Sequence, residues 1–236
     1  MRLLPLPGVF QPPSDARMLA GHLHGELRRP GLSVLDLCTG TGFLALVAAA
    51  GGASSVTAVD ISRRAVLAVR LNARLNGVRV KPVRGDLFAA VRGERFDVIV
   101  SNPPYLPNPT DLVPQQGIAR ASEAGRSGRV FIDRICAGAP AHLNEGGALL
   151  LVHSSVCGVR ETLDALARAG MPGRVVARQR GSLGPLLRAR ADWLRERGLL
   201  YEGDREDMLV IRAERTRVRH PSGAAPGSVA RPRIPA

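Results

Sequence analysis

The tetrapeptide Asn102-Pro103-Pro104-Tyr105 follows an apolar run and carries the most specific chemistry in the chain. Two consecutive prolines fix φ and remove two backbone donors, so the carbonyl oxygens there are held rigidly. The Asn102 amide oxygen and the Pro103 carbonyl can each accept one hydrogen from a planar NH2 group, and Tyr105 can stack on a flat acceptor. Two accepting oxygens stabilise positive charge as it develops on a poorly nucleophilic amide or arylamine nitrogen. The tetrapeptide therefore predicts group transfer onto a planar nitrogen without a strong base.

A glycine-rich turn follows an earlier apolar run, in the segment Val34–Ala45. Gly40 and Gly42 let the backbone turn sharply and approach a ligand at the carboxyl edge of a sheet. Asp60 ends the next run about 20 residues later, where a carboxylate can accept both hydroxyls of a ribose. The same spacing also matches a dinucleotide fingerprint, which makes a nicotinamide cofactor an alternative. Asp36 favours a different ligand, because its carboxylate repels a pyrophosphate but attracts the amino group and sulfonium of S-adenosyl-L-methionine.

The predicted donor site includes further residues beside these motifs. Asp86 follows the third run, where it can accept a hydrogen bond from the adenine amino group while Leu87 packs on the ring. Asp86 is also typical of a turn or helix N-cap, and that alternative stays open. We assign Cys38, within the glycine turn, and Ile61, directly after Asp60, to the same site. Asn102 contributes to both the donor site and the acceptor site.

Alternation of apolar runs with helix-like stretches predicts how these motifs are brought together. A strand, helix, strand repeat indicates a parallel sheet with helices on both faces. Leu67, Leu71 and Leu75 recur every four residues before Asn76-Gly77, which predicts an amphipathic crossover helix. Gly184–Gly198, with Trp193, is predicted as an inserted charged helix that either binds the acceptor or simply packs. The seven predicted strands are Ser33–Leu37, Ser55–Asp60, Val78–Arg84, Asp97–Ser101, Ala148–His153, Arg174–Arg180 and Asp207–Ala213.

The length of 236 residues, with 45% hydrophobic residues, suits one domain with a short extension. We predict a domain over residues 1–214 and a flexible Arg/Pro-rich tail over 215–236, where apolar residues are too few to fold. No apolar run reaches the roughly 18 residues of a membrane span, and the first ten residues do not resemble a secretory signal. We therefore expect no membrane span and no secretory signal, and the three cysteines without a C-x-x-C pair fit a reducing cytoplasm.

The net charge of +13 raises the possibility of a nucleic-acid partner. A large share of the excess lies after Glu214, in a stretch without acids, and Lys81 is the only lysine among 33 basic residues. Compositional drift toward arginine therefore explains the charge better than a selected polyanion surface does. The tail can still contact nucleic acid, but we do not favour it. Its arginines are Arg215, Arg217, Arg219, Arg231 and Arg233.

The cysteines and two of the histidines predict neither disulfides nor a metal site. Cys38, Cys136 and Cys157 are odd in number and form no C-x-x-C pair, which argues against a disulfide framework and a structural zinc. His22 and His24 have no metal-ligand partners nearby in sequence. We therefore expect no metal.

Taken in chain order, the motifs resemble those of the HemK/PrmC family of S-adenosylmethionine-dependent protein glutamine methyltransferases. The resemblance covers roughly Gly8 to Leu183, and it is strongest to the short, release-factor methyltransferase-like branch, since the first strand already begins at Ser33. It implies a Rossmann-like class I methyltransferase fold, in which a seven-stranded, mostly parallel sheet has an antiparallel last strand. It also implies a protein acceptor, with a translation release factor as the model, and a glutamine amide as the methylated group. Eukaryotic relatives work with a small zinc-containing partner; the sequence makes no prediction about one here.

Further matches and departures refine this resemblance. The segment Val9–Asp15 resembles the family's opening motif, whose aromatic residue and turn close over the cofactor. Gly117-Ile118, Gly125–Arg129 and Asp133-Arg134 resemble the short branch's segment leading into its next helix. Cys38 stands where many members have glycine. Ser122-Glu123 stands where the short branch often has a tryptophan, and this leaves the acceptor less certain.

Other functions remain as alternatives to protein glutamine methylation. Methyltransferases that act on adenine in nucleic acids use a similar tetrapeptide, but flipping a base requires a recognition region and stacking side chains, and this chain is 3% aromatic. A lysine or small-molecule acceptor is a further alternative, and a cofactor-binding subunit without catalysis is disfavoured by the intact tetrapeptide. His153 ends the fifth predicted strand, and we assign it no catalytic role.

Overall fold

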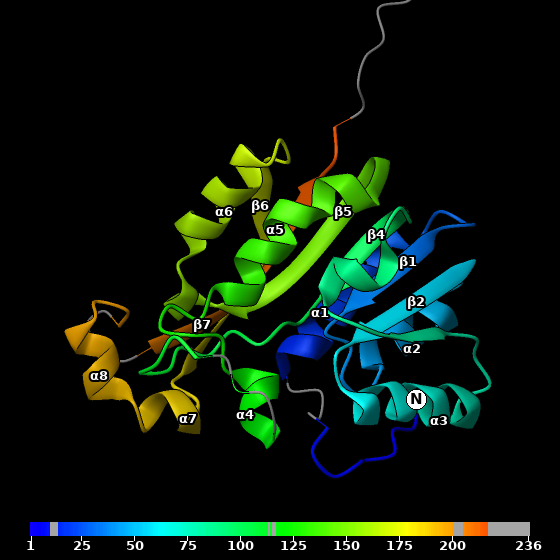
Figure 1. Cartoon of the computed structure of the whole chain (residues 1–236). Coiled ribbons are helices and arrows are strands. Elements are labelled where there is room, and N and C mark those ends of the chain that lie inside the picture. The colour runs from blue at the N-terminus through cyan, green and yellow to red at the C-terminus, as the bar shows by residue number, and fades with distance from the viewer. Residues whose placement is uncertain (10–13, 113, 115–116, 201–204, 217–236) are drawn as a thin grey trace, which may run out of the picture.

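A seven-stranded sheet forms the centre of the computed structural model, which describes residues 1–9, 14–112, 114, 117–200 and 205–216 (Figure 1). The strand order is β3-β2-β1-β4-β5-β7-β6. Strands β1 to β6 all run in the same direction, and β7 inserts between β5 and β6, antiparallel to both. The strands are β1 Ser33–Leu37, β2 Ser55–Asp60, β3 Lys81–Arg84, β4 Phe96–Ser101, β5 Leu143–Ser154, β6 Gly173–Ser182 and β7 Arg205–Glu214. The predicted α/β sheet with an antiparallel last strand is confirmed.

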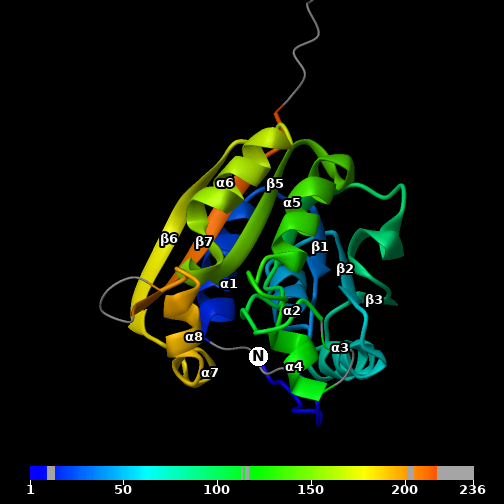
Figure 2. The ribbon, with the colours of Figure 1, turned by 60° about the vertical axis from the view of Figure 1, so that its left-hand side comes forward.

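Helices cover both faces of this sheet, because successive strand side chains alternate between two apolar cores. Leu35 and Ile99 face the core under α5 and α6, whereas Val34 and Val98 face the core under α1, α2 and α3. Figure 2 shows α5 and α6 on one face and α1 and α2 on the other. The longer helices are α1 Ser14–Glu26, α2 Phe43–Ala50, α3 Arg63–Leu75, α5 Val130–His142 and α6 Val159–Arg168.

The crossover helix α3 lies where the sequence predicts it, but its leucines do not form the buried face. Leu67 and Leu75 are 48% and 41% exposed, while Val69 and Asn72 are fully buried. Small side chains on the inner face let the helix sit close to the sheet, and buried Asn72 donates from Nδ2 to the Thr41 carbonyl at 2.9 Å. The four-residue spacing of leucines therefore predicted the helix correctly and its inner face wrongly.

The inserted segment before β7 forms two short helices, α7 Pro185–Arg188 and α8 Ala191–Glu196, rather than one. Leu187 and Leu194 are buried in the same core as α5 and α6, and Trp193 packs partly buried against it. The insertion therefore packs on the core, and its role in binding an acceptor stays a prediction. Two shorter elements, α4 Gly117–Ser122 and the 3-10 turn η1 Leu87–Val91, lie near the carboxyl edge of the sheet.

The described residues end just after β7, the strand that follows the insertion. Arg215 donates from its backbone nitrogen to the Gly147 carbonyl at 2.9 Å and from Nη1 to the Leu143 carbonyl at 2.5 Å. The fold therefore includes Arg215, the first residue of the predicted tail; residues 217–236 lie outside the described residues. No helix in the described ranges is long and apolar enough to span a membrane.

Candidate active site

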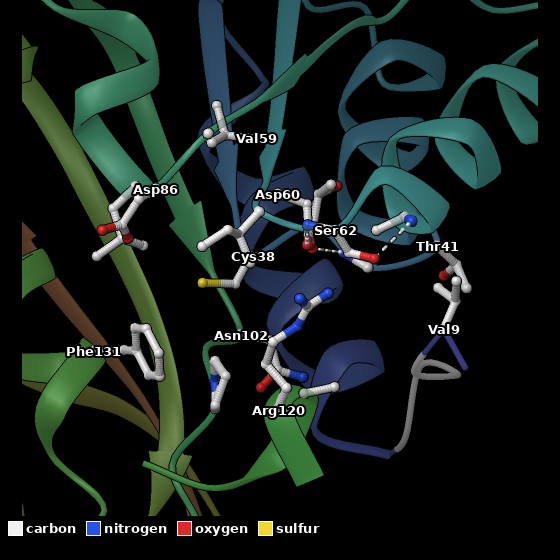
Figure 3. Close-up of a pocket in the computed structure, with 18 of the residues that line it drawn as sticks. Val9, Cys38, Thr41, Val59, Asp60, Ser62, Asp86, Asn102, Arg120 and Phe131 are labelled. Carbon is white, nitrogen blue, oxygen red and sulfur yellow. Dashed lines mark hydrogen bonds between the residues drawn. The ribbon is translucent and has the colours of Figure 1, made fainter. Parts of the chain in front are cut away.

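A cavity of about 350 Å³ opens at the carboxyl ends of β1, β2 and β4. The chain runs outward from β1 through β2 to β3 in one direction and from β4 to β5 in the other, so the cavity lies at the topological switch point. It joins the predicted donor and acceptor motifs (Figure 3). Its lining includes these predicted residues: Cys38, Gly40, Asp60, Ile61, Asp86, Leu87 and Asn102.

The glycine turn has left-handed backbone at three positions. Cys38, Gly40 and Gly42 have φ of +57°, +55° and +84°. Glycine adopts this conformation freely, whereas Cys38 holds it as a strained non-glycine residue. A Cβ on Gly42 would lie 3.0 Å from the Val69 side chain of α3. Gly42 is therefore required for the turn and for close packing of α3, and it lies outside the cavity lining.

Asp60 organises the edge of the donor site. Its Oδ2 accepts from the Gly40 backbone nitrogen at 3.0 Å, and its Oδ1 accepts from the Ser62 nitrogen at 2.8 Å. Burial raises the pKa of this carboxyl, and the backbone donors and the Arg120 charge oppose that rise. A carboxylate offers about four lone-pair sites, more than the three backbone donors Gly40, Ile61 and Ser62 use, so Asp60 can still accept a hydrogen bond from a ribose.

Asp36 lies beneath the glycine turn rather than on the cavity surface. It is fully buried, and its Oδ2 accepts from Thr39 Oγ1 at 2.5 Å and from the Ala45 nitrogen at 3.0 Å. Its Oδ1 is buried with no hydrogen-bond partner among the described residues. Burial raises the pKa of Asp36 to about 7, and the Asp60 charge adds to the rise. A buried carboxylate oxygen without a partner is costly, and a positive charge above the turn would stabilise its ionised form.

Asp86 forms an ion pair across the mouth of the donor site. Its Oδ2 lies 2.7 Å from Arg134 Nη2, and both side chains line the cavity about half-exposed. The following residue, Leu87, has a positive φ of +46° and is buried. Asp86 occupies the N-cap position of η1, and its carbonyl accepts from the Ala89 nitrogen at 3.1 Å, as the turn or N-cap alternative expects, but its side chain makes no capping hydrogen bond.

The acceptor motif is tied to the start of α1. Asn102 Nδ2 donates to Asp15 Oδ2 at 3.2 Å, and the Tyr105 hydroxyl donates to the same oxygen at 2.8 Å. Asn102 and Pro104 line the cavity in the described part of the chain, whereas Pro103 and Tyr105 lie outside its lining. Burial raises the pKa of Tyr105 well above its usual value. The stacking of Tyr105 on an acceptor and the acceptor role of the Pro103 carbonyl stay predictions.

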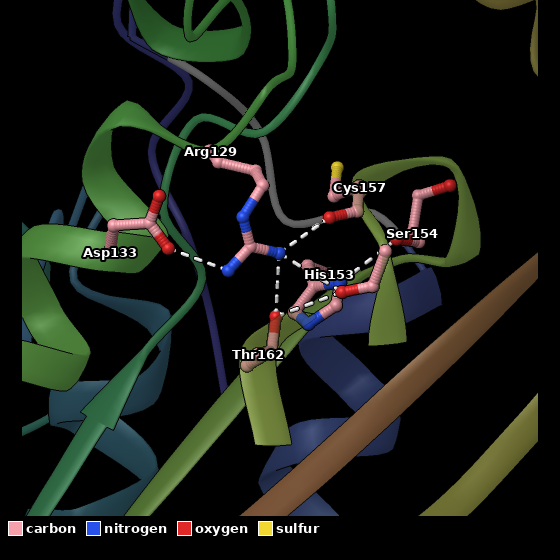
Figure 4. Close-up of polar contacts among 7 residues, drawn as sticks. Arg129, Asp133, His153, Ser154, Cys157 and Thr162 are labelled. Carbon is pink, nitrogen blue, oxygen red and sulfur yellow. Dashed lines mark hydrogen bonds and ion pairs between the residues drawn. The ribbon is translucent and has the colours of Figure 1, made fainter. Parts of the chain in front are cut away.

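The segment Gly125–Arg129 packs against this loop at Gly128. Figure 4 shows how Arg129 of the same segment contacts Asp133, Cys157 and Thr162. A Cβ on Gly128 would lie 2.2 Å from the Tyr105 carbonyl oxygen, so only glycine allows the two loops to approach. Arg129 Nη1 donates to the carbonyls of Cys157 and Gly158 at 2.5 and 3.0 Å, and Nη2 pairs with Asp133 at 2.6 Å. These contacts tie the start of α5 to the turn between β5 and α6.

His153 lies beside this cluster and is fully buried. Its Nδ1 contacts the Ser154 carbonyl at 2.8 Å, and burial lowers its pKa to about 4. Nε2 is buried without a partner in the part of the chain that the structure describes. His153 is outside the cavity lining, as expected of a residue with no assigned role.

The family model for the methyltransferase small domain matches residues 1–179. The chain belongs to this family. A Methanocaldococcus jannaschii protein named as a protein N5-glutamine methyltransferase is 34% identical over 172 residues, which is 73% of this chain and 85% of that protein. A release factor glutamine methyltransferase of Deinococcus radiodurans is 44% identical over 53% of this chain and 47% of its own length. These relatives confirm the resemblance to the HemK/PrmC group.

Solved methyltransferase structures confirm the fold. A chain of the E. cuniculi Mtq2–Trm112 complex, responsible for methylation of the eRF1 translation termination factor, has a TM-score of 0.62 at 24% identity. The match covers 89% of this chain and 99% of that one. The T. thermophilus 16S rRNA N2 G1207 methyltransferase, solved with AdoMet and guanosine, has a TM-score of 0.54 at 23% identity over 90% of this chain and 46% of that one. The chain spans about half the length of the release factor methyltransferases it matches.

The residues around the glycine turn are chemically suited to a cationic methyl donor that carries a ribose, as S-adenosylmethionine does. The buried, unpaired Asp36 Oδ1 suits the ligand's positive charge, and Asp60 has the acceptor capacity for a ribose. Among the described residues, no group of His, Cys, Asp and Glu side chains is placed to hold a metal ion.

Several lining residues were missed by sequence reasoning. Arg120 reaches from α4 toward Asp60, and Phe131 lines the far side of the cavity on α5. Their neighbours, Gly117-Ile118 and Gly125–Arg129, were singled out as loop motifs, so the segment was noticed but not its side chains. Asp15 belongs to the predicted opening motif, which was assigned to the cofactor rather than to Asn102. Phe10 to Pro13 of that motif lie outside the described residues.

Proposed function

We propose that this chain transfers a methyl group from S-adenosylmethionine to the side-chain amide nitrogen of a glutamine in a protein. The observation that carries the proposal is the orientation of Asn102. Its amide nitrogen is bonded to Asp15, so its amide oxygen is left for an acceptor, in the same cavity as the glycine turn and Asp60. Only a donor of hydrogen bonds, such as an NH2 group, satisfies that oxygen.

The donor would be held by side chains around the glycine turn. Asp60 would accept the ribose hydroxyls, and Asp86 with Leu87 would contact the adenine. Asp36 would stabilise the cationic part from beneath, and the Arg120 guanidinium would pair with the donor's carboxylate. Bound there, S-adenosylmethionine supplies a methyl carbon on a sulfonium; the acceptor nitrogen bonds this carbon, sulfur keeps the electron pair of the broken bond, and nitrogen loses a proton to water.

The acceptor would be held by the tetrapeptide. Asn102 Oδ1 and the Pro103 carbonyl would each accept one hydrogen of the amide NH2, which holds its nitrogen in line for attack. As positive charge develops on that nitrogen, both oxygens stabilise it more strongly than they stabilise the neutral amide. No residue needs to remove a proton beforehand.

The relatives point to translation as the source of the acceptor. Matched proteins are named as glutamine methyltransferases of release factors and of ribosomal protein uL3. A release factor is therefore the first acceptor to test. The Mtq2–Trm112 complex makes a small partner subunit a second component worth adding to the assay.

The test is a transfer assay with tritiated methyl donor and a fractionated lysate of the source organism, in parallel with purified release factor. Label is followed into protein after nuclease treatment and into nucleic acid after protease treatment. The proposal expects protease-sensitive label that acid hydrolysis releases as methylamine, as an N-methylated glutamine amide does. The chain with Asn102→Ala serves as the control for contaminating methyltransferases. Label that resists protease but is lost with nuclease would replace the proposal with nucleic-acid amine methylation.

A further inference from the structure

We propose that Asp15 is a positioning residue that fixes which end of the Asn102 amide faces the acceptor. This inference rests on the proposed function and deepens it. It also changes the role expected for the opening motif, which the resemblance assigned to closing over the cofactor.

The contacts place Asp15 at the centre of a buried network. Asp15 lies in the first turn of α1 and is only 2% exposed. Its Oδ1 accepts from the Ala16 nitrogen at 2.9 Å. Its Oδ2 accepts from both Asn102 Nδ2, at 3.2 Å, and the Tyr105 hydroxyl, at 2.8 Å. One carboxylate oxygen therefore ties together the first and last residues of the tetrapeptide.

An asparagine amide has two ends of nearly equal size, so sterics alone do not choose its orientation. An ionised carboxylate accepts hydrogen bonds and donates none, which makes it a strict selector. With Nδ2 bonded to Asp15, Oδ1 faces the acceptor. In the flipped orientation Oδ1 would lie against the Asp15 carboxylate, and the Asn102 NH2 would meet the acceptor NH2, donor against donor.

A purely structural role explains the burial of Asp15 less well. A buried carboxylate costs free energy unless its oxygens are bonded, and an apolar residue would pack at this helix face beside Leu19 and Leu23. The bonded partners of Oδ2 are two polar side chains of the tetrapeptide itself, which lie 87 and 90 residues away in sequence. The charge is placed where it controls the tetrapeptide.

The experiment exchanges the two ends of the Asp15–Asn102 hydrogen bond. In Asp15→Asn the single remaining side-chain oxygen stays on the Ala16 backbone N–H, which cannot reverse its polarity, so the new NH2 group faces Asn102. Asn102 then flips and presents the wrong end to the acceptor. We expect turnover to fall at least about thirtyfold, with the dissociation constant of S-adenosylmethionine unchanged within about threefold. The exchange variant Asp15→Asn/Asn102→Asp restores one donor and one acceptor in the bond and leaves a carboxylate oxygen facing the acceptor. We expect its turnover to exceed that of both Asp15→Asn and Asn102→Asp.

Asp164→Asn, the same chemical change at a half-exposed position of α6, is the matched control and should leave turnover unchanged. The acceptor probe is the protein fraction that the wild type labels. A readout independent of turnover is the side-chain NH2 signal of Asn102 in 15N NMR, whose proton exchange should accelerate in Asp15→Asn.

The outcomes separate the two proposals. If the wild type labels no protein, the proposed function fails whatever Asp15 does. If the wild type labels protein and Asp15→Asn keeps its turnover, the inference about Asp15 is overturned alone. The inference would also be overturned if the turnover of the exchange variant did not exceed that of the less active single variant while all melting temperatures stayed near that of the wild type. A variant that fails to fold is recognised by its loss of donor binding. The exchange of the Asn102 NH2 protons then decides: slow exchange in the wild type that persists in Tyr105→Phe, which keeps the Asp15–Asn102 bond, supports the inference, and fast exchange overturns it.

Discussion

The donor half and the acceptor half of the cavity are built in different ways. In the donor half, the organising contacts join residues close in sequence: Asp60 with Gly40 and Ser62, and Asp36 with Thr39 and Ala45, at separations of 2 to 20 residues. In the acceptor half, the contacts of Asn102 and Tyr105 with Asp15 span 87 and 90 residues. The donor site is a local turn structure, whereas the acceptor site requires the whole domain to be folded.

This difference predicts that donor binding and methyl transfer are separable. Substitutions in the tetrapeptide and its long-range partners should lower turnover and spare donor affinity. Substitutions at the local carboxylates should lower donor affinity directly, because they contact or face the donor itself. Four variants test this division, in order of decreasing effect.

Asn102→Ala should have the largest effect. The change removes an oxygen that stabilises charge developing on the acceptor nitrogen, so we expect turnover to fall at least about a hundredfold. The affinity for S-adenosylmethionine should stay within a few-fold, because the Asp60 and Asp36 contacts remain. Single-turnover kinetics give the first quantity and titration calorimetry the second. Loss of donor binding in calorimetry would contradict the assignment of Asn102 to the acceptor side.

Asp60→Ala should act on the other half. It removes the acceptor for the ribose and also the two backbone bonds that shape the turn from Gly40 to Ser62. Loss of bonds to a charged group costs about 2 kcal/mol, so we expect donor affinity to fall about thirtyfold. At saturating donor, turnover should recover to within a few-fold of the wild type. A turnover that stays low at saturation would show that the two halves are not separable at Asp60.

Local patterns explain why the donor half could be predicted from sequence. The seven apolar runs correspond to the seven strands, and Cys38, Gly40, Asp60, Ile61, Asp86 and Leu87 all line the cavity. Glycine turns and strand-end carboxylates determine their own geometry over a few residues. The predicted start of β5, Ala148, is five residues late, because Gly146 and Gly147 suggest a break in the strand. In the structure β5 begins at Leu143, which pairs with Phe96 across an irregular register.

The acceptor half could be predicted in its motif but not in its environment. Nothing local indicates that Asp15 bonds Asn102, since that contact depends on how distant elements pack. Glu123 illustrates the same limit. Where the short branch often has a tryptophan, Glu123 Oε1 pairs with Arg190 of the insertion, and only the folded chain brings them together.

The pH dependence of donor binding tests the role of Asp36, with a moderate expected effect. Its pKa is raised by burial from 3.8 to about 7, so the carboxyl of the free protein is largely protonated at pH 6 and ionised at pH 8. A cationic donor favours the ionised form, and binding below pH 7 therefore releases a proton. We expect the dissociation constant to rise about tenfold from pH 8 to pH 6.

Calorimetry in two buffers of different ionisation enthalpy measures that proton directly. Asp36→Asn should bind more weakly at pH 8 and with little pH dependence. His153 does not confuse the measurement, because its pKa is lowered to about 4. A wild type whose donor affinity is flat from pH 6 to pH 8 would remove Asp36 from the donor's charge balance.

The clamp between the insertion and the acceptor loop should give the smallest effect. Arg190 Nη1 donates to the Pro107 carbonyl at 2.7 Å, and Nη2 pairs with Glu123, whose Oε2 accepts from Asn108 Nδ2 at 3.1 Å. Both charged side chains are mostly buried, at 23% and 15% exposure. Arg190→Met should lower kcat about three- to fivefold and leave donor affinity unchanged, because the loop after Tyr105 loses one of its long-range ties.

A double-mutant cycle distinguishes this clamp from general destabilisation. Arg190→Met leaves Glu123 charged and half-paired, whereas Glu123→Gln/Arg190→Met removes that unpaired charge, so the double variant should melt at a higher temperature than Arg190→Met alone. Arg195→Met, on the exposed side of α8, is the matched control and should change neither quantity. If Arg190→Met instead weakens donor binding while sparing kcat, contacts from the insertion reach the donor half, and the division between a local donor site and a long-range acceptor site does not hold.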